Sequence, residues 1–162
     1  MFDSIKKFFL GDKREVRRVV ENNIIGRLSF DDDIEAWESV VNIQGMKIKF
    51  HISGDWSKER DIIAPSSSLI EEAEKIVRHF NDFSESVAGF VEEQIRSVPD
   101  LREWSDEIRS LKISQVHFYW ADRPKDGEII FSSEALEKAS NTRIWACAIK
   151  DGMPAPMLSF SS

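Results

Sequence analysis

The sequence predicts an α+β protein with an antiparallel sheet of about six or seven strands. Two or three helices are expected between an N-terminal three-stranded meander and a C-terminal β block. Two observations carry this prediction. Apolar and polar residues alternate in two separate parts of the chain, and apolar residues recur at helical spacing in the part between them. Strands that follow one another through tight turns pair antiparallel, because parallel neighbours need a long crossover connection.

Residues 1–22 are predicted to form a basic amphipathic helical segment at the N-terminus. Its apolar face would carry Phe2, Ile5, Phe8 and Phe9, with lysines beside them. Such a stripe docks on the body of the protein, on a partner or on a membrane surface, and we favour docking on the body. The apolar run at 8–10 is too short for a secretory signal, and no apolar stretch is long enough for a membrane span.

Three strands are expected next, at residues 24–30, 35–43 and 46–53. The last of them, MKIKFHIS, alternates strictly between apolar and polar residues. Gln44-Gly45 has the composition of a two-residue hairpin turn, because glycine accepts a positive φ. The acidic run Asp31-Asp32-Asp33 is expected to close the first strand as a turn.

The middle of the chain is predicted to be helical. Ser68 and Glu71 have the spacing of a capping box, and the apolar residues that follow recur at helical intervals. A break at Asn81-Asp82 separates a second helix, and Pro99 opens a short third one.

Strand periodicity returns at residues 112–120, KISQVHFYW, where Val116, Phe118 and Trp120 share the apolar face. Further strands are expected at 128–131, 143–149 and 157–160. No repeat, low-complexity tract or Pro/Gly-rich linker divides the chain, so residues 1–162 are expected to form one domain.

The spacing of key residues excludes several chemistries. No two glycines lie closer than nine positions, so the dinucleotide, Walker and nucleophile-elbow motifs are absent. The histidines, at 51, 79 and 117, lack the short spacings of zinc sites. Cys147 is the only cysteine, which excludes an intramolecular disulfide and suits a reducing, cytoplasmic compartment. We expect no cofactor and no metal.

An enzymatic alternative rests on His51 and His117, which both fall on the polar faces of predicted strands. If those strands were neighbours, the two imidazoles and Tyr119 would form an acid/base cluster of the kind that metal-free hydrolases and nucleases use. Solvent-facing strand positions are the simpler interpretation of both histidines.

The acidic run 31–33 also invites a calcium interpretation, but it lacks the EF-hand pattern. Ala36 stands where the loop needs its glycine, and Asn42 stands where it needs a glutamate. We therefore expect a solvated hairpin turn whose carboxylates accept backbone N–H bonds.

The net charge of -7 is unevenly distributed. Residues 1–30 hold seven Lys/Arg and four Asp/Glu, whereas the remainder holds 15 and 25. An acidic body disfavours nucleic acid as the partner and suits a basic protein surface. Trp56 and Trp104 lie away from periodic apolar stripes, so each is either a clamp on the core or an interface anchor.

Three stretches resemble one group of proteins. They are the start MFDSIKKFF, the hairpin pattern IIGRLSF…AWESVVNI…MKIKFHIS, and the closing IIFSS…RIWACAIKDGMP. The chain resembles small acidic bacterial domains of unknown function that include proposed immunity proteins of polymorphic and contact-dependent toxins. The resemblance implies a non-enzymatic protein that binds and blocks a cognate toxin domain, often a basic nuclease. The partner-binding residues are expected on turns, at Asp31, Asp32, Asp33, Asp55, Trp56 and Glu59.

Overall fold

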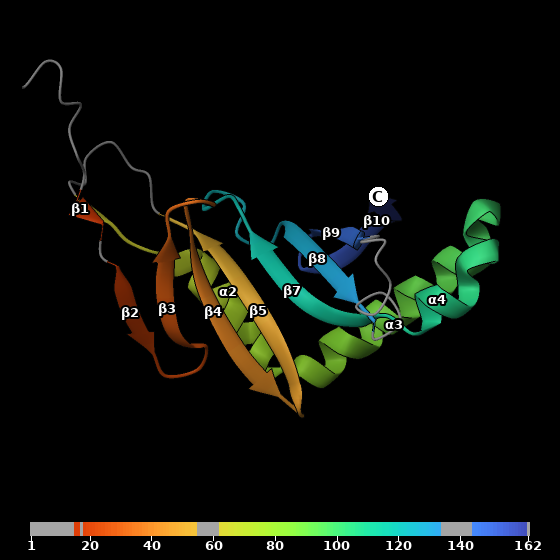
Figure 1. Cartoon of the computed structure of the whole chain (residues 1–162), viewed down its shortest axis with the longest axis horizontal. Coiled ribbons are helices and arrows are strands. Elements are labelled where there is room, and N and C mark those ends of the chain that lie inside the picture. The colour runs from red at the N-terminus through yellow and green to blue at the C-terminus, as the bar shows by residue number, and fades with distance from the viewer. Residues whose placement is uncertain (1–14, 17, 55–61, 134–143, 162) are drawn as a thin grey trace, which may run out of the picture.

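An eight-stranded sheet dominates the computed structural model, which describes residues 15–16, 18–54, 62–133 and 144–161 (Figure 1). The strand order is β10-β9-β8-β7-β5-β4-β3-β2, and the helices lie behind the sheet in this view. The α+β class is confirmed, and the strands outnumber the six or seven predicted.

The N-terminal half of the sheet is an antiparallel meander of four strands. They are β2 (Val19–Asn22), β3 (Gly26–Asp31), β4 (Ala36–Ile43) and β5 (Met46–Ser53). Gln44 and Gly45 have φ values of 54° and 82°, as a type I′ turn between β4 and β5 requires. The three strands predicted here are confirmed, and β2 is the additional one.

The C-terminal half is a second antiparallel meander. It consists of β7 (Lys112–Phe118), β8 (Gly127–Ser132), β9 (Ile144–Lys150) and β10 (Met153–Ser161). Asp151 and Gly152 both have positive φ and turn the chain from β9 into β10.

The expectation of a purely antiparallel sheet is wrong at the joint between the two meanders. Strands β5 and β7 pair parallel, with His51 opposite His117 in the register. The chain leaves β5 at one end of the sheet, and the helical block returns it to the other end before β7 begins. That block is the long crossover that a parallel pair needs.

The predicted N-terminal helical segment also needs correction. Val19–Asn22, at its end, forms the edge strand β2, and β1 (Glu15–Val16) pairs parallel with β6 (Ile62–Ile63). Asn22 Oδ1 accepts the N–H groups of Ile24 and Ile25, which folds this stretch into a turn leading to β3. The phenylalanine stripe at residues 2–9 lies outside the described residues.

The crossover contains α2 (Ser67–Arg78), α3 (Phe80–Ser97), the 3-10 helix η1 (Pro99–Trp104) and α4 (Ser105–Arg109). The predicted capping box at Ser68 does not form. Helix α2 begins two residues earlier than predicted, with Ser66 as its N-cap, and the Ser68 hydroxyl donates to the carbonyl of Ala121 at 3.2 Å. None of the described helices is long and apolar enough to cross a membrane.

The core lies between the helices and one face of the sheet. Fully buried sheet residues such as Trp37, Phe50 and Trp145 pack in one cluster with Leu69 and Ala73 of α2. Because side chains alternate along a strand, the polar residues of the central strands point to the opposite face. We call this opposite side the open face; it carries Glu38, Lys49, His51, Gln115, His117 and Glu128.

Candidate functional site

A row of ionisable side chains crosses the open face. Glu38 of β4 is the register partner of His51 on β5, His51 is the partner of His117 on β7, and His117 is the partner of Glu128 on β8. The parallel joint therefore brings together two histidines that are far apart in the sequence. The condition set for the acid/base cluster, that their strands be neighbours, is met.

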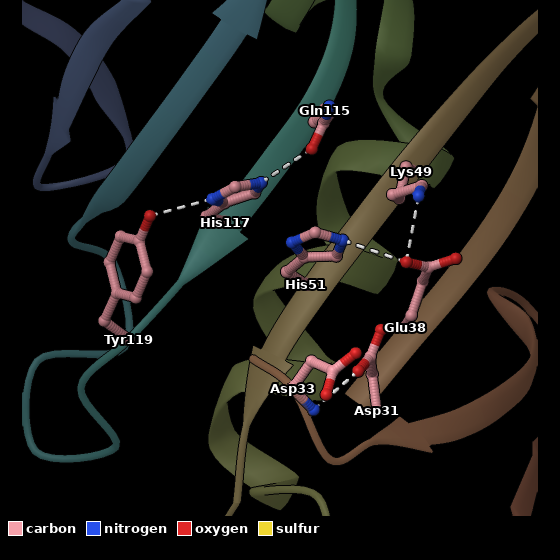
Figure 2. Close-up of polar contacts among 8 residues, drawn as sticks. All are labelled: Asp31, Asp33, Glu38, Lys49, His51, Gln115, His117 and Tyr119. Carbon is pink, nitrogen blue, oxygen red and sulfur yellow. Dashed lines mark hydrogen bonds and ion pairs between the residues drawn. The ribbon is translucent and has the colours of Figure 1, made fainter. Parts of the chain in front are cut away.

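The two imidazoles stack face to face. Their ring centroids are 4.3 Å apart, and the ring planes meet at 24°. Only 15% of the His51 side chain and 12% of the His117 side chain are exposed. Both rings are therefore largely shielded from water although they lie on the open face. Figure 2 shows the two imidazoles side by side on neighbouring strands.

A carboxylate orients His51. Glu38 Oε2 lies 3.2 Å from His51 Nε2 and 2.9 Å from Lys49 Nζ. Burial acts to raise the pKa of Glu38, but hydrogen bonds and charge from Lys49 and His51 bring it below its ordinary value. The ionised carboxylate only accepts hydrogen bonds, so the neutral ring donates through Nε2–H and keeps its lone pair on Nδ1. The described residues place no hydrogen-bond partner on that Nδ1.

His117 is held on both sides. Its Nδ1 lies 2.8 Å from the Tyr119 hydroxyl, and its Nε2 lies 3.0 Å from Gln115 Oε1. The Tyr119 hydroxyl donates to Glu128 Oε2 at 2.9 Å, so its oxygen is left to accept the Nδ1–H of the ring. A neutral ring then carries no proton on Nε2, so the Gln115 amide donates to that nitrogen once its NH2 group is turned toward the ring. Figure 2 shows Tyr119 and Gln115 on opposite sides of the His117 ring.

The surroundings keep this cluster uncharged at its centre. Burial lowers the pKa of His51, and burial together with the nearby charges of His51 and Lys49 lowers the pKa of His117 to about 4. Burial and the neighbouring Glu128 carboxylate raise the pKa of Tyr119. At neutral pH both imidazoles are therefore neutral, and neither is tuned as a general acid. His51 Nδ1 remains available only as a base.

An acidic hollow lies beside the row, at the turn between β3 and β4. It is lined by Ser29, Phe30, Asp31, Asp32, Asp33 and Glu38. Asp31 Oδ1 accepts the backbone N–H of Asp33 at 2.9 Å, and Asp32 pairs with Arg18. The expected hairpin turn with carboxylate-to-backbone bonding is confirmed. No group of three or more His, Cys, Asp or Glu in the described ranges is arranged to hold a metal ion.

An exposed aromatic patch, formed by Tyr119, Trp120 and Arg123, lies just beyond the end of β7. The side chains of Tyr119 and Trp120 contact edge to face, with ring centroids 5.3 Å apart, and the Arg123 guanidinium lies 4.8 Å from the Trp120 ring. Tyr119 is 41% and Trp120 43% exposed. The expectation that Trp120 shares the apolar face of the strand is wrong, because β7 ends two residues before it, at Phe118.

The residues expected to bind a partner have different outcomes. Asp31, Asp32 and Asp33 line the acidic hollow, whereas Asp55, Trp56 and Glu59 lie outside the described residues. Trp104, one of the two isolated tryptophans, packs against the core cluster, in tilted contact with Phe160. The aromatic patch was missed from the sequence. The available signal that the strand ends early is the turn at Arg123-Pro124, which begins three residues after Trp120.

Comparison of the chain with protein-family models, curated proteins and solved structures found no match.

Proposed function

We propose that this chain is a non-catalytic protein-binding module, an immunity protein that neutralises a cognate basic toxin domain in the bacterial cytoplasm. The observation that supports it most is the shared position of the acidic hollow and the aromatic patch. Asp31 is the last residue of β3 and Ser53 is the last residue of β5, and Ala36 is the register partner of both. Ile52 is the register partner of Phe118, the residue before Tyr119. Both features therefore lie at the upper end of the sheet in Figure 1.

The two features supply different parts of a binding surface. Tryptophan, tyrosine and arginine are the residue types that most often carry the energy of a protein interface, and the patch holds one of each. The carboxylates at 31–33 give the adjoining surface a negative potential, which speeds the encounter with a basic partner. The overall charge of -7 acts in the same direction.

Affinity capture from a lysate of the source cells tests this proposal when the bait is compared with designed variants. Trp120→Ala removes the patch anchor, and the double change Asp31→Lys with Asp33→Lys reverses the charge of the hollow. The double change Asp100→Lys with Glu103→Lys, at two exposed acids of η1, is the charge-matched control. We expect one stoichiometric basic protein, bound by the native chain and by the control.

Each variant has its own kinetic expectation. Trp120→Ala should speed dissociation at least about tenfold, and the double charge reversal should slow association. The captured protein should also be toxic when produced alone and harmless when produced with the native chain. Equal capture by all four baits, or a captured protein without toxicity, contradicts the proposal.

A second function is favoured by one observation, the Glu38–His51 contact. Glu38 fixes the tautomer of His51 and leaves Nδ1 without a hydrogen-bond partner among the described residues, which is the usual arrangement of a general base. In this alternative, a metal-free hydrolase or nuclease would use His51 as base, with His117 and Tyr119 beside it. The lowered pKa values of both imidazoles weaken it, since a weaker base transfers protons less readily.

A hydrolase assay against RNA and simple phosphodiesters, in the presence of a metal chelator, separates the two functions. The alternative requires turnover that His51→Gln abolishes and that His79→Gln, on the surface between α2 and α3, leaves intact. Absence of turnover, or turnover that persists in His51→Gln, rules it out.

A further inference from the structure

We propose that the His51–His117 stack is a proton-sensitive joint, in which protonation of both rings parts β5 from β7 and separates the two meanders of the sheet. This inference concerns the sheet itself and does not depend on the proposed function. It rests on the place of the stack in the topology and on the charges that face it.

The stack lies at the only pairing between the meanders in the described part of the sheet. The β5–β7 ladder has four register pairs, Lys49–Gln115, Phe50–Val116, His51–His117 and Ile52–Phe118. The β4–β5 ladder beside it has eight. The two rings thus occupy one of the few rungs that join the halves of the sheet. A repulsion placed there acts directly on the joint.

The groups around the stack accommodate one added proton better than two. On the β5 side, Glu38 of β4 already accepts hydrogen bonds from both Lys49 and His51, and Asp31 at the end of β3 adds a more distant negative charge. A first proton on His51 therefore faces a carboxylate at 3.2 Å.

A second proton on His117 meets a less favourable setting. On the β7 side, the oxygens of Gln115 and Tyr119 can accept hydrogen bonds from the charged ring, but neither carries a charge that offsets its own. Glu128 of β8 already accepts a hydrogen bond from the Tyr119 hydroxyl and lies 3.9 Å from Nδ1. The nearest charge is then the His51 imidazolium, whose ring centroid is 4.3 Å away. Lys49 adds further positive charge, and acidification also discharges the carboxylates that oppose it.

Each meander keeps its own antiparallel hydrogen bonds when the joint opens. The β4–β5 and β7–β8 ladders each contain only one of the two imidazoles, so repulsion between the rings does not act across the hydrogen bonds of either ladder. Opening should therefore be confined to the amides that β5 and β7 share. It should precede unfolding of the whole chain as the pH falls.

Hydrogen exchange of the full-length chain at about pH 7 and about pH 3.5, with rates corrected for the intrinsic pH dependence, tests this inference. We expect the shared β5–β7 amides to lose protection at least about tenfold more than those of β3–β4 and β8–β9. His117→Gln, which keeps a polar side chain and cannot become charged, should abolish the selective loss. His79→Gln, at the exposed histidine between α2 and α3, should retain it.

A second variant covers the case in which His117→Gln does not fold. Lys49→Gln keeps both histidines and removes one facing cation, so the selective loss at about pH 3.5 should be smaller than in the native chain. An equal loss of protection in all ladders overturns the inference, as does a selective loss that survives in His117→Gln or one that is undiminished in Lys49→Gln. Full protection of the joint at the acid pH also overturns it.

Discussion

Trp145 and Glu107 are joined by a hydrogen bond of 2.6 Å from the indole Nε1 to Oε1. Trp145 belongs to the core face of β9 and Glu107 to the short helix α4, so the bond ties the end of the crossover to the C-terminal meander. The indole is otherwise fully buried. A hydrogen bond to a charged acceptor at the border of the core contributes more to the free energy of unfolding than an exposed hydrogen bond does.

The first prediction concerns that bond. Trp145→Phe should lower the free energy of unfolding by about 2–3 kcal/mol, because it removes both the charged hydrogen bond and part of the buried ring. Urea unfolding followed by circular dichroism measures the change. Trp120→Phe, at an exposed tryptophan, should cost about 0.5 kcal/mol or less. A loss at position 145 no larger than at position 120 would show that the bond does not hold α4.

Two glycines should respond in opposite directions to the same substitution. A Cβ at Gly127 would lie 2.2 Å from the backbone oxygen of His117, so Gly127→Ala should push β8 away from β7 and cost about 2 kcal/mol or more. A Cβ at Gly89 meets nothing within 4 Å in the middle of α3, so Gly89→Ala should stabilise by about 0.5–1 kcal/mol. Thermal unfolding compares the two directly. Equal effects would mean that β7 and β8 are not packed as closely as described.

The stability of the fold should depend on His117 below neutral pH. Burial, then the charges of His51 and Lys49, lower its pKa from 6.5 to about 4, so the unfolded chain binds more protons than the folded chain between these values. The free energy of unfolding should therefore fall as the pH drops from about 6.5 to about 4, by roughly 3 kcal/mol from this group. Urea unfolding at a series of pH values measures it. His117→Gln should flatten that part of the profile, and an unchanged slope in the variant would assign it to other groups.

The thiol of Cys147 should be inert in the folded protein. Burial, with a smaller effect of Glu128, raises its pKa to about 12, and the side chain is 2% exposed on the core face of β9. A disulfide reagent at about pH 8 should label it only at the rate of unfolding, and fully in denaturant, since the thiolate is the reactive form. Fast stoichiometric labelling under native conditions would contradict its burial.

Tyr119 offers a direct optical test of the open face, because it is the only tyrosine in the chain. Burial and the Glu128 carboxylate raise its pKa, so phenolate absorbance should develop at higher pH than in a model peptide. Glu128→Gln should bring the midpoint partly back toward the ordinary value of about 10 by removing the negative charge. A native midpoint near 10 would mean that the hydroxyl is not bonded to Glu128.

Periodicity predicted most of the sheet, because the strands have one buried face. Met46–Ser53 was placed with its observed bounds, and the strands around Glu128 and Trp145 were placed within a residue or two. Alternation reports which side chains are buried, but it does not report the direction of a neighbouring strand. The parallel joint between β5 and β7 depends on which end of the sheet the crossover returns to, and no local pattern encodes that.

The candidate site was predicted in parts for the same reason. The polar faces of the strands at His51 and His117 were visible in the sequence, and their contact depended on the pairing that the sequence left open. No role was predicted for Glu38 or Glu128, because their contacts with His51 and Tyr119 depend on which strands are neighbours. Trp120 was misplaced because alternation was extended past Phe118, where the chain had already left the sheet.

The division of the sheet into two meanders has a consequence for how the chain folds. Within each meander most contacts join residues that are close in sequence, so its hairpins close quickly and at small entropic cost. The joint between β5 and β7 needs the whole crossover to be in place first. On a ribosome, the N-terminal meander can assemble before β7 has been synthesised, leaving β5 as a temporary edge strand. The lysines and the histidine along β5, polar and chargeable, would then discourage that edge from pairing with another chain.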